Sequence, residues 1–343
     1  KHVGIWGIIN ATALMISSVS DLGMNNILMI DSDDGVLKSF KSISAISLVV
    51  STLFGVVFSI IFSNIYDELD FFFLIITLPI FFFTFQQIQL SYVWLNRNKE
   101  YNVLMLNPII QQLFYGLIAI TLGYYNFKVK GLILAYFFAN IFTLINMRRK
   151  TPLVFITINI QDIIYTIKKN WEFVKFQSIS NLISSTQSQF PIFIIKILWG
   201  DSIVGLYSMA VKILKAPVTF IAKAIGRVFF QIISEFKLQG KDFSAFAYKN
   251  IINNLYYAIF PLSLIIAFGD IIVALFLGEE WIETGNYLKL LGIQYYFVFI
   301  TGSIQGLSII LKKQKYAMIV NLAQMLVYVV SFMSIKFGLM KNE

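Results

Sequence analysis

Long apolar stretches dominate the chain, and they restrict its fold more than any single motif does. A helix needs about 20 mostly apolar residues to cross the hydrocarbon core of a bilayer. Only 13% of the residues are charged, whereas a soluble domain carries roughly 25%. The sequence therefore predicts an all-α membrane protein with about ten visible transmembrane helices, at residues 5–30, 42–64, 71–95, 102–124, 130–147, 173–198, 203–232, 250–277, 286–311 and 316–337.

Basic residues orient the predicted helices. Loops on one side hold fifteen Lys and Arg, whereas the alternate loops and the two ends hold four. Cytoplasmic loops carry the excess of Lys and Arg, so the richer set is assigned to the cytoplasm. Residue 1 then lies outside, and because no signal peptide is recognisable we expect at least one further helix before it. The fifteen are Lys38, Lys41, Arg97, Lys99, Arg148, Arg149, Lys150, Lys168, Lys169, Lys237, Lys241, Lys249, Lys312, Lys313 and Lys315.

Two short motifs recur six predicted helices apart. VGIW at 3–6 resembles VGLY at 204–207, and RNKEY at 97–101 resembles KKQKY at 312–316. An even offset predicts a parallel repeat, related by an axis along the membrane normal. We therefore expect a parent protein of twelve or more helices, arranged as two six-helix lobes around a central cavity.

The longest basic connection divides the chain. Residues 148–172 are expected to form a basic cytoplasmic linker, with a candidate interfacial helix within 153–167. Residues 1–147 would form the N-terminal helical lobe without its first helix. Residues 173–343 would form the C-terminal helical lobe, incomplete at its C-terminus.

One predicted helix, 203–232, carries four cations and no acid: Lys212, Lys215, Lys223 and Arg227. At 100° per residue the other three lie within about 60° of Lys212 on either side, so the four share an arc of about 120° along roughly 22 Å of helix. A Lys or Arg at the bilayer centre costs about 2.5–3.5 kcal/mol, so such residues usually face a cavity or a partner. A water-filled cationic cavity is favoured; snorkelling to the interfaces or ion pairs with other helices are the alternatives.

Uncharged polar residues provide weaker candidates. Asn181, Ser185, Gln189 and Lys289 are candidates for lining the cavity, with helix packing as the alternative. The glutamines of 86–89 are more typical of packing contacts. Asp21 and Asp270 lie near predicted helix ends and are interpreted as interface residues.

Several function classes are excluded by composition. The chain has no cysteine and a single histidine, so thiolate catalysis, a His-based triad and a zinc site are not expected. No phosphate loop or dinucleotide fingerprint occurs, and no cofactor is expected. No nucleic-acid-binding module is visible.

Order and spacing of several motifs resemble a known family. GLYSMA at 205–210, followed by Lys212 and Pro217 and then by FF at 229–230, resembles the eighth helix of polysaccharide flippases. These belong to the multidrug/oligosaccharidyl-lipid/polysaccharide exporter superfamily. VGIW, continuing to Leu22 and Gly23, resembles that family's second helix.

The resemblance implies a V-shaped fold in a bacterial inner (plasma) membrane. It implies translocation of an undecaprenyl-diphosphate-linked oligosaccharide from the cytoplasmic to the outer leaflet, as in O-antigen or lipopolysaccharide synthesis. Members often carry an acid in the seventh helix, where this chain has QSQFP at 187–191, so ion coupling by that acid is in doubt.

The leading hypothesis is thus a non-enzymatic flippase whose cationic stripe contacts the diphosphate, with Arg227 at the inner mouth. The alternatives are a cation-coupled multidrug exporter of the same fold and a non-transporting component of a glycan-assembly complex. Expected partners are the lipid-linked oligosaccharide, the phospholipid bilayer and other glycan-assembly membrane proteins, and no nucleic acid. Coupling to a proton, to sodium or to the membrane potential is compatible with these features.

Overall fold

The computed structural model describes the chain except for residues 26, 32, 153–158, 172, 305–313 and 341–343. Over the described residues it contains helices and no strand, which confirms the all-α prediction. The helices are α1 (His2–Ser20), α2 (Ile27–Ile30), α3 (Asp33–Ile65), α4 (Phe71–Arg97), α5 (Tyr101–Tyr124), α6 (Lys128–Met147), α7 (Ile160–Lys169), α8 (Ser178–Leu238), α9 (Ser244–Leu277), α10 (Ile282–Ile304) and α12 (Gln314–Met340). A π-helical turn (Phe173–Gln177) precedes α8, and a 3-10 turn (Glu279–Trp281) precedes α10.

Membrane-spanning length and composition occur in seven helical segments of the described chain. This agrees with a polytopic membrane protein, while the count of ten and the six-helix repeat stay predictions. One segment covers 46 residues, 174–219, and contains Gly200 at φ 80° and ψ −177°. Because these angles are not helical, α8 is two helices that meet at Gly200. The ends of the predicted helix 286–311 and of the motif 312–316 lie partly outside the described residues.

The chain forms two compact units. One holds residues 4–191 and the other residues 192–343, with the first three residues divided between them. This division lies beyond the predicted linker at 148–172, because the first turns of α8 pack with the N-terminal helices. The predicted lobes therefore stay a prediction.

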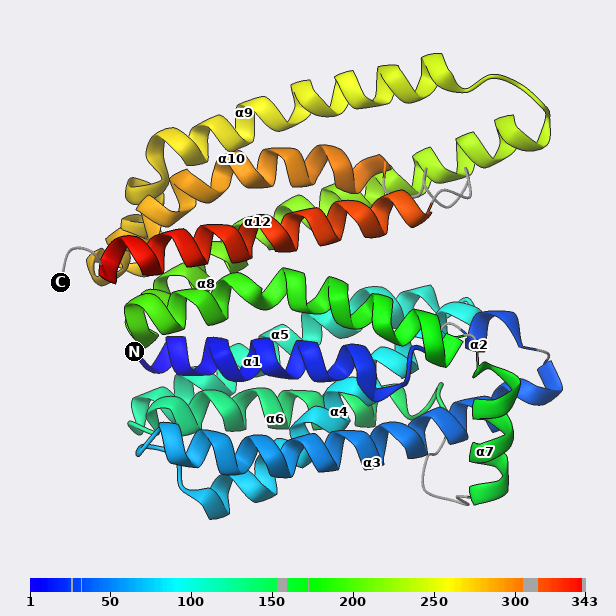
Figure 1. Cartoon of the computed structure of the whole chain (residues 1–343), viewed down its shortest axis with the longest axis horizontal. Coiled ribbons are helices and arrows are strands. Elements are labelled where there is room, and N and C mark those ends of the chain that lie inside the picture. Colours follow the sequence, from blue (N-terminus) through cyan, green and yellow to red (C-terminus); the bar gives the residue numbers. More distant parts are fainter. Residues whose placement is uncertain (26, 32, 153–158, 172, 305–313, 341–343) are drawn as a thin grey trace. The chain divides into compact units, whose positions relative to one another are not determined.

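In the N-terminal unit, α3 packs on α4, α4 on α6 and α6 on α5 (Figure 1). A close crossing joins Gly55 to Pro79, where a Cβ on the glycine would lie 2.5 Å from the proline Cα. Since a side chain there would meet backbone, only glycine allows α3 and α4 this approach.

The predicted helix 5–30 is wrong in its second half, because α1 ends at Ser20. Leu22 and Gly23 adopt positive φ values of 50° and 71°, which no α-helix accepts. The Asp21 carboxylate accepts hydrogen bonds from the backbone N–H groups of Gly23 and Asn25, both at 3.1 Å. A short polar side chain that bonds backbone two residues on favours a turn over a helix. This turn shapes the site described below.

The short helix α7 lies against the start of α3. Its Ile163 and Ile167 pack on the buried cluster around Phe40, and Asp162 pairs with Lys38 at 2.7 Å. Ile164 and other apolar residues on its remaining surface are exposed. The helix is amphipathic, as the predicted interfacial helix requires, although residues 153–158 lie outside the described part; its position at an interface stays a prediction.

In the C-terminal unit, α9 and α10 form the main contact and bury a cluster with the second half of α8 (Figure 1). Gly269 and Gly285 face each other across the contact between α9 and α10. A Cβ on Gly285 would lie 2.3 Å from the Cα of Asp270. Next to this contact, Lys289 Nζ lies 2.8 Å from Asp270 Oδ2.

Candidate functional site

The four predicted cations all stand on the second half of α8. Its backbone is helical from residue 201 to 238, including Pro217, so no break interrupts the predicted stripe. The side chains of Lys212 and Lys215 are exposed. Those of Lys223 and Arg227 lie outside what the structure describes. Among the described residues, no acid lies within ion-pair distance of Lys212.

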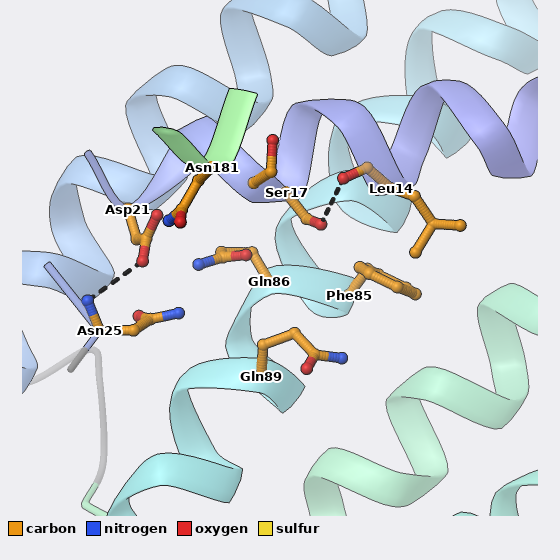
Figure 2. Close-up of a pocket in the computed structure, with 9 residues that line it drawn as sticks. Leu14, Ser17, Asp21, Asn25, Phe85, Gln86, Gln89 and Asn181 are labelled. Atoms are coloured by element: carbon orange, nitrogen blue, oxygen red, sulfur yellow. Dashed lines mark hydrogen bonds between the residues drawn. The ribbon is translucent and has the colours of Figure 1, made fainter. Parts of the chain in front are cut away.

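A polar pocket of about 260 Å³ lies in the N-terminal unit (Figure 2). Its walls come from α1, from the turn after it, from α4 and from the first turns of α8. The lining residues are Leu14, Ser17, Ser18, Asp21, Asn25, Phe85, Gln86, Gln89 and Asn181. In Figure 2 the side chains of Asp21, Asn25, Gln86 and Asn181 gather at one end of the pocket.

Asp21 is the charged group of this pocket and is only 3% exposed. Burial raises the pKa of its carboxyl above the ordinary value, while hydrogen bonds from the N–H groups of Asn25 and Gly23 lower it. Burial disfavours the charged form, and hydrogen bonds to that form favour it. The net effect makes Asp21 easier to protonate than an exposed aspartate. Its assignment to the membrane interface stays a prediction, to which the structure adds that the side chain is buried within the N-terminal unit.

Two amide groups of the pocket lack a partner within the described chain. Gln86 is 1% exposed, and its Nε2 donates no hydrogen bond there. The Oδ1 of Asn25 is likewise buried and accepts none. Buried polar groups are normally hydrogen-bonded, so an unpaired donor and an unpaired acceptor at one pocket point to an occupant that supplies both.

The predicted lining residues divide between the two units. Asn181 lines this pocket and accepts a hydrogen bond from Gln177 Nε2 at 2.8 Å. The hydroxyl of Ser185 donates to the carbonyl oxygen of Leu14 (3.2 Å), which ties α8 to α1. Gln189 is buried and donates to its neighbour Ser188 at 3.0 Å. Lys289 stands in the other unit, where it pairs with Asp270.

The glutamines of α4 divide between packing and the pocket. Gln87 accepts from the hydroxyl of Ser44 and donates to that of Ser47, both at 2.9 Å, which is the packing role that was predicted. Gln86 and Gln89 instead face the pocket. In the sequence, the signal for this pocket was the cluster of three glutamines on α4. It could be interpreted only once the structure showed that the turn at Asp21 places a carboxylate beside them.

Charged groups also fasten the helix ends predicted to be cytoplasmic. Arg97, at the end of α4, donates to the carbonyl oxygens of Leu28 (2.5 Å) and Asp31 (2.8 Å). The carboxylate of Asp31 pairs with Lys169 of α7 at 2.6 Å, and this contact raises the pKa of Lys169. These cations hold α2, α4 and α7 together. They therefore stabilise the fold in addition to marking the predicted cytoplasmic side.

No group of three or more His, Cys, Asp or Glu side chains suited to a metal ion occurs in the described part of the chain. Compared with known proteins, residues 2–286 match a family model described as "polysaccharide biosynthesis protein". No curated protein and no solved structure matches the chain significantly.

Proposed function

Because the chain belongs to the polysaccharide biosynthesis protein family, we propose that it moves a lipid-linked oligosaccharide across the membrane in which its apolar helices stand. The substrate would be an undecaprenyl-diphosphate-linked oligosaccharide, carried from the cytoplasmic to the outer leaflet of a bacterial plasma membrane. Alternating access of two helical lobes would expose the substrate to each side in turn. No bond needs to be broken, so the protein would act as a transporter and not as an enzyme.

The observation that carries this proposal is the exposed, acid-free neighbourhood of Lys212 on the uninterrupted second half of α8. With Lys215, Lys223 and Arg227 on the same helix, it supports a cationic stripe roughly 22 Å long. A diphosphate must lose hydration when it crosses the bilayer, and charge-assisted contacts offset part of that cost. Lysine suits a transient contact because its ammonium is a point charge on a flexible stem.

A cation-coupled drug exporter is less well supported. Such an exporter needs an intramembrane acid that can hold a cationic drug. Asp270 of α9 is already paired with Lys289, and the carboxylate of Asp21 accepts hydrogen bonds from the N–H groups of Gly23 and Asn25. The flippase proposal needs no such acid.

The test is translocation by the full-length protein in liposomes, using a fluorescent undecaprenyl-diphosphate oligosaccharide and a membrane-impermeant quencher. Lys212→Ala with Lys215→Ala should slow translocation at least tenfold, and Lys→Arg at both positions should restore most of it. Lys249→Ala, which removes an exposed cation from α9, is the matched control and should leave the rate unchanged.

Two outcomes count against the proposal. Wild-type protein that moves no substrate refutes the transport function. Wild-type rates in the double alanine variant refute the stripe. Repeating the assay with a proton gradient, a sodium gradient or a membrane potential alone identifies the driving force.

A further inference from the structure

The pocket beneath Asp21 presents hydrogen-bonding groups of both kinds to whatever occupies it. The free lone pairs of Asp21 and the Oδ1 of Asn25 require donors, while the Nε2 of Gln86 requires an acceptor. The hydroxyl groups of Ser17 and Ser18 already donate to backbone carbonyl oxygens of α1, so they offer only acceptor oxygens. An occupant must therefore donate and accept at closely spaced atoms.

We propose that this pocket binds one pyranose ring of the glycan, a subsite for sugar hydroxyls separate in chemistry from the cationic stripe. The identity of the ligand as a sugar rests on the proposed function. A hydroxyl both donates and accepts, so a vicinal diol can donate to Asp21 and Asn25 and accept from Gln86. Asn181 then contributes a further amide from α8.

The size and wall composition fit this occupant. A volume of about 260 Å³ equals that of roughly nine waters in the liquid, which is room for one sugar ring. Phe85 closes one side of the pocket (Figure 2) and offers an apolar surface to the C–H face of a pyranose. Apolar walls with a few convergent polar groups are typical of a small-molecule site.

A bare cation fits less well. Sodium would be coordinated by the oxygens of Asp21 and Asn25, but it cannot accept a hydrogen bond. The buried N–H groups of Gln86 would remain unpaired, and an unpaired buried donor is unfavourable. A hydroxyl ligand satisfies both sides at once.

The pocket also has a route of entry. Gln89 of its lining is exposed, whereas Gln86, one turn earlier on α4, is buried. Gln86 stands eleven residues before Arg97, so it lies roughly 16 Å along the helix from an end predicted to be cytoplasmic. A sugar delivered from the cytoplasmic side would thus meet Gln89 before it reaches Gln86.

The inference is tested on the full chain in lipid nanodiscs by saturation-transfer NMR. The probes are methyl glycosides of glucose, galactose and N-acetylglucosamine, which carry neither lipid nor phosphate. Wild-type protein should bind at least one of them. Gln86→Leu and Asn181→Ala should each weaken that binding about three- to tenfold, the effect of one lost neutral hydrogen bond.

Controls separate binding from folding. Ser63→Ala removes an exposed hydroxyl that bonds only its own helix and should bind as wild type. Asn181 is half-buried at the pocket edge, so its variant keeps the test valid if Gln86→Leu unfolds, which thermal unfolding reports.

The outcomes are distinct from those of the translocation assay. The sugar subsite is overturned if no glycoside binds, if both variants bind the glycoside as tightly as the wild type, or if the pocket binds sodium in place of a glycoside. Translocation without glycoside binding therefore refutes the subsite alone. Glycoside binding without translocation supports the subsite and refutes the transport function.

Discussion

The contact between α9 and α10 makes a sharp prediction for Gly285→Ala. The added methyl carbon would lie 2.3 Å from the Cα of Asp270 and 2.5 Å from its backbone nitrogen. An ordinary contact of this kind needs about 3.5 Å or more, so the two backbones must separate by roughly 1 Å. Neither atom belongs to a side chain that could turn aside.

The cost follows from what such a separation loosens. The same interface buries Leu262 and Leu288 in the core of the C-terminal unit and holds the Lys289–Asp270 ion pair. Overpacking a tight interior costs about 1–3 kcal/mol. We expect Gly285→Ala to lower the free energy of unfolding by that amount, despite the higher helix propensity of alanine.

Gly116→Ala is the matched control. A Cβ on Gly116, in the middle of α5, meets nothing within 4 Å. The substitution should therefore stabilise the protein by up to about 1 kcal/mol through helix propensity alone. Reversible unfolding in mixed micelles, followed by tryptophan fluorescence, measures both. A Gly285→Ala protein as stable as Gly116→Ala would refute the close helix contact.

Three further predictions concern polar groups of the N-terminal unit. Arg97→Ala should destabilise the protein by about 1.5–3 kcal/mol, because two charge-assisted hydrogen bonds to backbone carbonyls are lost; unfolding titrations measure this, and an unchanged midpoint would contradict it. Gln87→Leu should cost about 1–3 kcal/mol, since the buried hydroxyl of Ser44 loses its acceptor while that of Ser47 keeps its bond to the Ser44 carbonyl; the same titration measures this, and an unchanged midpoint would contradict it. The raised pKa of Asp21 means that the folded protein binds a proton more readily than the unfolded chain does. The contribution of this group to stability is therefore fully present below the unfolded pKa of 3.8, and it is lost as the pH rises through the folded pKa. Asp21→Asn should abolish that part of the pH dependence, and an identical pH profile in the variant would remove Asp21 as its source.

Much of the fold was readable from the sequence because hydropathy and loop length report it directly. The helices α3 to α6 begin and end within a few residues of the predicted boundaries, apart from α3, which starts nine residues earlier. The break at Asp21 was not predicted, since the apolar pattern continues through it. Its cause is a local competition, in which the side chain of Asp21 bonds the backbone of the next residues, and hydropathy does not register that competition.

The site was less predictable than the fold. Charges on a single helix can be placed by helical periodicity, so the stripe on α8 could be proposed from the spacing of Lys212, Lys215, Lys223 and Arg227. The pocket requires residues from α1, α4 and α8 that are up to 167 positions apart, as Leu14 and Asn181 are. Periodicity within one helix carries no information about which helices become neighbours. Gln86 therefore resembled its packing neighbour Gln87 until the structure separated the two.

Pairing, more than position, distinguishes the cations of this chain. Several cations of the linker and the helix ends meet acids or carbonyl groups: Lys38 pairs with Asp162, and Lys169 with Asp31. Even Lys289, inside the second unit, has Asp270. Those pairs stabilise the fold, and their charges are neutralised locally. Lys212 has no such acid among the described residues, so folding alone does not account for a charge on that helix. A ligand that brings its own negative charge does account for it. For this reason we place the diphosphate at Lys212 and the uncharged sugar at the amide-lined pocket.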